Sequence, residues 1–180
     1  MKKIITYVLV VLAMAAGTSC KKDSAKNSTD FHTPATAAPD GLAGNWSSGF
    51  SSMTELVDVY TGQYVGNAWQ SGKFFKITAN GKNAEFYYTA QSQTMQSATK
   101  AIGTIAFDEG SDATEGSFVF YAGWAHYNGW GSTHVNRDAT SDELTNNLSG
   151  RYYYQVEGQW LRIQPGEPVN DYSSSFEQIN

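Results

Sequence analysis

Residues 73–88, KFFKITANGKNAEFYY, contain two runs with side chains alternating between two faces, separated by an Asn-Gly pair. Asn-Gly between two alternating runs is the strongest short-range signal for a β-hairpin, because both residues accept the backbone angles of a tight turn. A second hairpin is predicted around Glu157-Gly158. One of its faces would carry Tyr152, Tyr154, Val156, Leu161 and Ile163, and the other Tyr153, Trp160 and Arg162.

Strand-like runs dominate the rest of the chain after residue 40. One short helix is predicted at 140–147, where Thr140 and Glu143 have the spacing of a capping box. The pattern therefore predicts an all-β domain of eight to ten antiparallel strands with at most one short helix, and leaves a closed barrel and a sandwich both open. The further strands are predicted at 43–50, 54–60, 63–69, 101–108, 117–124 and 172–179.

The first residues have the pattern of a targeting segment. Three residues with two lysines precede an uncharged, mostly apolar run from Ile4 to Gly17. A basic start, a short apolar run and small residues after it are typical of a secretory signal peptide, which we place at residues 1–19. Cys20 follows directly and is the sole cysteine, so no internal disulfide can form.

Residues 20–40 differ in composition from the rest of the chain. They are rich in Lys, Ser, Thr, Ala and Pro and have little apolar bulk, which predicts a flexible tether to one domain at 41–180. That domain contains seven Lys and Arg residues against fourteen Asp and Glu residues. This acidic balance argues against nucleic acid as a partner.

The stretch Thr18-Ser19-Cys20 resembles the lipobox of bacterial lipoproteins, although Gly17 stands where a larger aliphatic residue is usual. The resemblance implies that Cys20 carries the lipid and becomes the mature N-terminus. The lipid bilayer would then be a partner and the bacterial outer membrane the location, with the periplasmic or surface-facing side left open.

Gly44-Asn45-Trp46 fits the Gly-x-Trp signature that opens the first strand of lipocalin-like barrels. The layout of strands after it is also similar to the lipocalin-like (calycin-type) domains of bacterial lipoproteins. In that family the tryptophan closes one end of the barrel, and an arginine from a late strand packs over it. The resemblance therefore implies a lipocalin-like barrel with a structural pair, Trp46 and Arg162, at its end.

Motifs of catalysis and metal binding are missing, so neither an enzyme nor a cofactor is expected. His126 and His134 could join Asp138 or Glu143 as zinc ligands, but a zinc site needs three or four converging ligands, and loop residues facing solvent are favoured. Arg137 and Asp138 are expected to form a local salt bridge.

An acidic loop, DEGSDATEG, contains three carboxylates that could be considered for glycoside hydrolysis, which needs two acids on either side of the bond. Its glycines favour a solvated turn instead. The three acids are Glu109, Asp112 and Glu115.

The aromatic residues of segment 121–134 are the candidates for ligand binding. Alternation breaks after Tyr121, and Trp124, Tyr127 and Trp130 stand between glycines, which predicts a bent loop. Rings with a polar tip suit a small apolar ligand or a sugar face.

Two functions remain open for these rings. One is a binding module that holds a small, mostly apolar ligand inside the barrel. The other is a surface interaction or glycan-binding protein with a filled interior, and an open pocket of roughly 300 Å³ or more inside the barrel would favour the first. The rings could also simply cover one end of the barrel.

Overall fold

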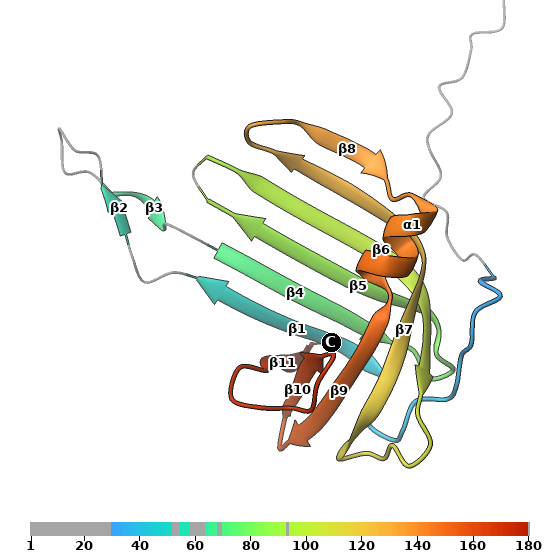
Figure 1. The fold of residues 1–180 in the computed structure, drawn as a ribbon. Coiled ribbons are helices and arrows are strands. Elements are labelled where there is room, and N and C mark those ends of the chain that lie inside the picture. The colour runs from blue at the N-terminus through green and yellow to red at the C-terminus, as the bar shows by residue number, and fades with distance from the viewer. Residues whose placement is uncertain (1–29, 52–54, 58–63, 68–69, 93, 180) are drawn as a thin grey trace, which may run out of the picture.

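The computed structural model describes residues 30–51, 55–57, 64–67, 70–92 and 94–179 (Figure 1). Cys20 and the expected signal peptide lie outside these residues. The described residues form eleven strands and one short helical segment. The elements are β1 (Gly44–Ser51), β2 (Glu55–Val57), β3 (Tyr64–Asn67), β4 (Gln70–Ile77), β5 (Lys82–Gln91), β6 (Gln96–Phe107), β7 (Glu115–Trp130), β8 (Val135–Asp138), α1 (Ser141–Glu143), η1 (Leu144–Leu148), β9 (Gly150–Glu157), β10 (Trp160–Pro165) and β11 (Ser174–Ile179).

Eight strands close into an up-and-down barrel. Strands β1, β4, β5, β6, β7, β9, β10 and β11 each pair antiparallel with the next one in chain order, and β11 returns to pair with β1. Strand β8 adds to the edge of β7, and β2 and β3 form a separate two-stranded sheet. The predicted all-β barrel is therefore confirmed, and the sandwich is excluded.

The barrel is closed over only half of its height. Strand β9 pairs with residues 115–120 of β7, and β11 pairs with residues 45–47 of β1. The longer pairings among β1, β4, β5, β6 and β7 continue beyond these contacts, so the upper half is an open curved sheet (Figure 1).

The helical segment matches its prediction. Thr140 caps α1, and the Glu143 side chain and backbone complete the capping box. The segment ends in a π-helical turn, η1, where Leu144 and Leu148 pack against the barrel core. No helix in the part of the chain that the structure describes is long and apolar enough to cross a membrane.

Aromatic rings fill the closed half. The Phe75 ring on β4 lies 4.8 Å from Phe86, 5.5 Å from Tyr152 and 5.7 Å from Phe176, measured between ring centroids. These rings come from β5, β9 and β11, so one side chain contacts several walls of the barrel. The Phe118 ring of β7 stacks on Tyr152 at 5.4 Å. Both predicted hairpins form, since Phe75 pairs with Phe86 in the first, and Leu161 with Val156 and Ile163 with Tyr154 in the second.

The expected contact between Trp46 and Arg162 does not form. Trp46 is buried as expected, with 4 % of its surface exposed, and its indole N–H donates to the Leu42 carbonyl at 2.9 Å. Arg162 lies between two buried residues, Leu161 and Ile163, and therefore faces outward. Its guanidinium donates to Glu157 and to the Asn170 carbonyl. The resemblance predicted the buried tryptophan correctly but gave it the wrong partner.

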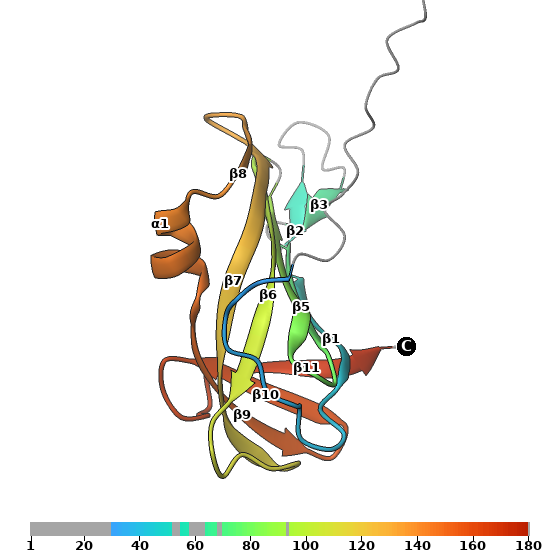
Figure 2. The same ribbon diagram turned by 90° about the vertical axis from the view of Figure 1, so that its right-hand side faces the viewer.

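The folded part also begins earlier than residue 41. We call residues 31–38 the strap, and Figure 2 shows it, in blue, running along the outside of β6. The Thr36 N–H donates to the Ile105 carbonyl at 3.1 Å, and the Phe107 N–H donates to the Thr36 hydroxyl at 2.7 Å. The Thr104 hydroxyl donates to the Pro34 carbonyl at 2.7 Å, and Thr104 is only 2 % exposed. The composition of this segment predicted a flexible tether. Composition alone cannot show that the threonine hydroxyls and backbone of the segment find hydrogen-bond partners on β6.

The strap is held at its start by an aromatic side chain. The Phe31 ring lies so close to Gly123 that a Cβ atom at this glycine would overlap it. We expect Gly123→Ala to displace the ring and cost about 1–3 kcal/mol of unfolding free energy, the range for overpacking. In a Phe31→Ala background, Gly123→Ala should cost under about 0.5 kcal/mol, because its clash has been removed.

Chemical denaturation of the four chains measures this coupling. Gly49→Ala is the matched control, since no atom lies within 4 Å of the added Cβ atom, and it should change stability by less than about 0.5 kcal/mol. Additive costs for Phe31→Ala and Gly123→Ala would show that the ring does not rest on this glycine.

Candidate functional site

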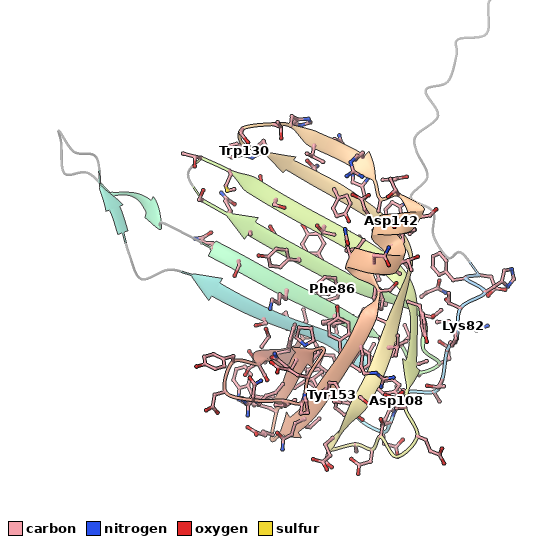
Figure 3. All side chains as sticks on the ribbon, in the orientation of Figure 1. Lys82, Phe86, Asp108, Trp130, Asp142 and Tyr153 are labelled. Atoms are coloured by element: carbon pink, nitrogen blue, oxygen red, sulfur yellow. The ribbon has the colours of Figure 1, made fainter. Side chains whose placement is uncertain are left out.

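A pocket of about 380 Å³ lies at the distal ends of β6, β7 and β8, on the open half of the barrel. We call it the distal pocket. Figure 3 shows Trp130 at these strand ends, well away from Phe86 in the barrel. The residues that define the pocket include Ser97, Tyr127, Trp130, Val135, Arg137 and Glu143.

A β-bulge in β7 decides on which face of the sheet its later side chains lie. Ile102 pairs with Trp124 and Gly103 with Ala122, so Gly123 has no partner on β6. One extra residue reverses the alternation of faces along a strand. Before the bulge Phe120 is buried, and after it Ala125 is buried, which places Tyr127 on the inner face and Trp124 on the outer face.

The predicted loop at 121–134 is therefore wrong for most of its length. Residues 121–130 stay in β7, and only the connection to β8 is a turn. The break in alternation that suggested a loop is the bulge at Gly123. A single inserted residue and a loop leave the same trace in a sequence, because both interrupt the period of two.

Two of the three candidate rings lie at the distal pocket. Tyr127 and Trp130 line it, and the Trp130 indole N–H donates to Gln96 Oε1 at 2.9 Å. Trp130 is 45 % exposed. Trp124 instead stacks on His126, with centroids 6.2 Å apart and ring planes 20° apart, on the outer face. Trp130 follows Trp124 by six residues and so lies on the same side of β7, but it stands at the end of the strand, where it borders the pocket and Trp124 does not.

Arg137 and Glu143 form one wall of the pocket. The Arg137 guanidinium donates to both Glu143 oxygens, at 2.7 and 2.8 Å, and lies 5.2 Å above the Tyr127 ring. The same Glu143 carboxylate accepts the Thr140 N–H at 2.8 Å. The Glu143 carboxylate therefore links Arg137 on β8 to the start of α1 at the wall of the pocket.

These bonds set the charge state of the wall. The hydrogen bond from Arg137, and after it the one from the Thr140 N–H, lowers the pKa of Glu143 from 4.5 to about 2. The bond to Glu143 raises the pKa of Arg137 above its already high value. Burial, and secondarily the Glu143 charge, raises the pKa of Tyr127. The pair is therefore ionised, and Tyr127 neutral, at physiological pH.

The expected salt bridge between Arg137 and Asp138 is wrong. Adjacent residues of a strand point to opposite faces, so Arg137 turns inward to Glu143 and Asp138 turns outward. Asp138 Oδ1 lies 2.8 Å from His126 Nδ1, and Asn136 Oδ1 lies 2.8 Å from His126 Nε2. Each nitrogen of this imidazole therefore faces a protein oxygen.

The metal candidates do not converge. His134 is exposed in the connection before β8, and Glu143 faces the other side of the sheet from His126. Within the described ranges, no group of three or more His, Cys, Asp or Glu side chains is placed to hold a metal ion. In the β6–β7 loop, Asp112 Oδ1 accepts the N–H groups of Thr114 and Glu115 and shapes a turn.

Two other hollows are larger than the distal pocket, but neither is lined by Trp124, Tyr127 or Trp130. One, of about 470 Å³, lies near Tyr153 and the β6–β7 loop. The other, of about 420 Å³, lies beside Trp46 at the closed end. Volume alone does not single out a site, so we select the distal pocket for its two rings and its ion pair.

Sequence reasoning missed two parts of the pocket. Strand β8 was not predicted, because a four-residue strand lies below what alternation can detect. The pairing of Arg137 with Glu143 was also missed, although the capping box had already placed Glu143 at the start of a helix. Comparison with known proteins adds no relative: no protein-family model, curated protein or solved structure matches the chain.

Acid should loosen the pocket wall through Glu143. Its pKa is depressed in the folded chain, so its contribution to stability is complete above about pH 4.5 and is lost as the pH falls toward 2. The ¹³C resonance of the Glu143 carboxyl should titrate with a midpoint near 2. Asp142→Asn, one residue away, should leave this midpoint unchanged. A midpoint near 4.5 would mean that Arg137 does not pair with Glu143 in solution.

Proposed function

We propose that the chain is a lipid-anchored protein of the bacterial outer membrane whose barrel domain binds a small amphipathic ligand in the distal pocket. One observation carries the binding proposal. Rings around Phe75 fill the closed half of the barrel, whereas an open pocket of about 380 Å³ on the other half is lined by Tyr127 and Trp130. That volume is within the usual range for small-molecule sites.

This proposal favours the surface alternative over an apolar ligand held deep in the barrel. The closed half already contains Phe75, Phe118 and Phe176, each at most 2 % exposed. A ligand there would have to displace packed rings. Loss of the contacts of such a ring is costly, since replacing a buried phenylalanine by alanine lowers the free energy of unfolding by about 3–5 kcal/mol. The distal pocket requires no such displacement.

The anchor and the family are proposed from the sequence. The Thr18-Ser19-Cys20 pattern and the apolar run before it support lipid attachment at Cys20. A lipocalin-like origin is supported by the consecutive order of the eight strands and by β1 beginning at Gly44, with Trp46 buried.

Replacement of the proposed lipid attachment site tests the anchor. Cys20→Ser removes the thiol that would carry the acyl chain, so cells fed a labelled fatty acid should no longer label the protein, and it should leave the membrane fraction. Ser19→Ala, which keeps a small residue before the cysteine, is the control and should label normally. Label on the Cys20→Ser chain would contradict the anchor.

The binding proposal is tested with two tryptophans of similar exposure. Trp130 is 45 % exposed and lines the pocket, whereas Trp160 is 42 % exposed on the outer face of β10. Native mass spectrometry of the full chain, purified in detergent from its own cells, should show a bound small molecule. Trp130→Ala should lose it and Trp160→Ala should keep it. A bound molecule that survives Trp130→Ala would place the site elsewhere.

A further inference from the structure

We infer that the ligand of the distal pocket is an uncharged carbohydrate, an inference that rests on the proposed function and names the ligand class. The first reason is charge. Arg137 and Glu143 are the charged residues of the pocket lining, and two hydrogen bonds of 2.7 and 2.8 Å join them. An ionised ligand would give up hydration here without gaining an unpaired opposite charge.

The charge of the whole domain acts in the same direction. Its fourteen acidic residues outnumber its seven basic ones, so its field repels anionic ligands. On β6, which borders the pocket, Lys100 is also engaged, since it lies 2.9 Å from Glu85. A uronate or a phosphate would therefore find little attraction at this end of the barrel.

The second reason is the shape of the apolar surface. One face of Tyr127 is covered by the Arg137 guanidinium. The Trp130 ring remains 45 % exposed, and its N–H is occupied by Gln96, so it offers a ring face rather than a donor. The Trp130 ring, held in place by this hydrogen bond, therefore presents one exposed face. Such a face can stack on a flat apolar surface such as the C–H face of a pyranose.

The third reason is the polar rim around that ring. Asn128, Ser132 and Thr133 line the pocket and are exposed, and their side chains carry both donors and acceptors. A purely aliphatic ligand would cover these groups without hydrogen-bonding them, which is costly. A sugar has an apolar face and a hydroxyl-bearing edge and no charge, which matches the three properties together.

The test is an NMR titration of the full chain in detergent, read at the Trp130 indole N–H resonance. The probes are neutral oligosaccharides of glucose, galactose, mannose, xylose and N-acetylglucosamine, oligomers of galacturonate and glucuronate, lauric acid, and adenosine. At least one neutral oligosaccharide should shift the resonance and bind more tightly than the uronate oligomer of the same length. Read at the backbone amide resonance of Thr133, which also lines the pocket, Trp130→Ala should weaken this binding about tenfold or more, and Trp160→Ala less than about twofold.

Glu143→Gln provides a second readout, because it should shift the preference of the pocket from neutral toward anionic ligands. It keeps the shape of the side chain but leaves the Arg137 charge unbalanced, so uronate oligomers should gain affinity relative to neutral ones. The Thr140 amide resonance reports whether α1 stays formed in this variant. If this variant folds and uronates gain nothing, the charge argument is wrong.

The remaining outcomes separate the two proposals. A Trp130 shift with uronates, lauric acid or adenosine, and none with the neutral oligosaccharides, would overturn the carbohydrate inference and leave the binding function standing. No shift with any probe would overturn the inference and, together with the lack of a bound molecule in native mass spectrometry, the binding function as well.

Discussion

The contacts of the Phe75 ring are the constraint on which the barrel depends. It meets Phe86, Tyr152 and Phe176 from three other strands within 5.7 Å, so the walls of the closed half are joined through side chains as well as through backbone pairing. An eight-stranded barrel is just wide enough for side chains to fill it. Filling the interior of the closed half with rings leaves only the open half of the interior for a ligand.

The bulge at Gly123 is the second determinant, and it acts on both faces of β7 together. On the inner face it brings Tyr127 to the pocket, and on the outer face it provides the bare backbone against which Phe31 rests. Opposite it, a Cβ atom on Gly103 would overlap the Tyr121 carbonyl, so β6 also has to lack a side chain there. Gly123, which the sequence placed in a loop, therefore allows close approach within a continuous sheet.

The sequence predicts well whatever depends on neighbours along the chain. Phe75 and Ile77 are buried, and the Thr140–Glu143 capping box is present, because alternation and cap spacing are local. It fails where a partner comes from far away. The strap bonds to Thr104, about 70 positions later, and nothing in a polar segment identifies that partner. One inserted residue in β7 was enough to make residues 121–130 look like a loop, since it interrupts the alternation that marks a strand.

The strap has a mechanical consequence if Cys20 is fixed in a membrane. Any pull between membrane and domain enters through residue 30 and reaches Phe31, the Thr33–Thr104 hydroxyl pair and Thr36 before it reaches the barrel. Those contacts are few and lie one after another, so they would open in sequence. Releasing residues 31–38 would free a segment with an extended length of about 26–29 Å, at roughly 3.3–3.6 Å a residue. The strap would thus detach and lengthen under force before the force reaches the barrel.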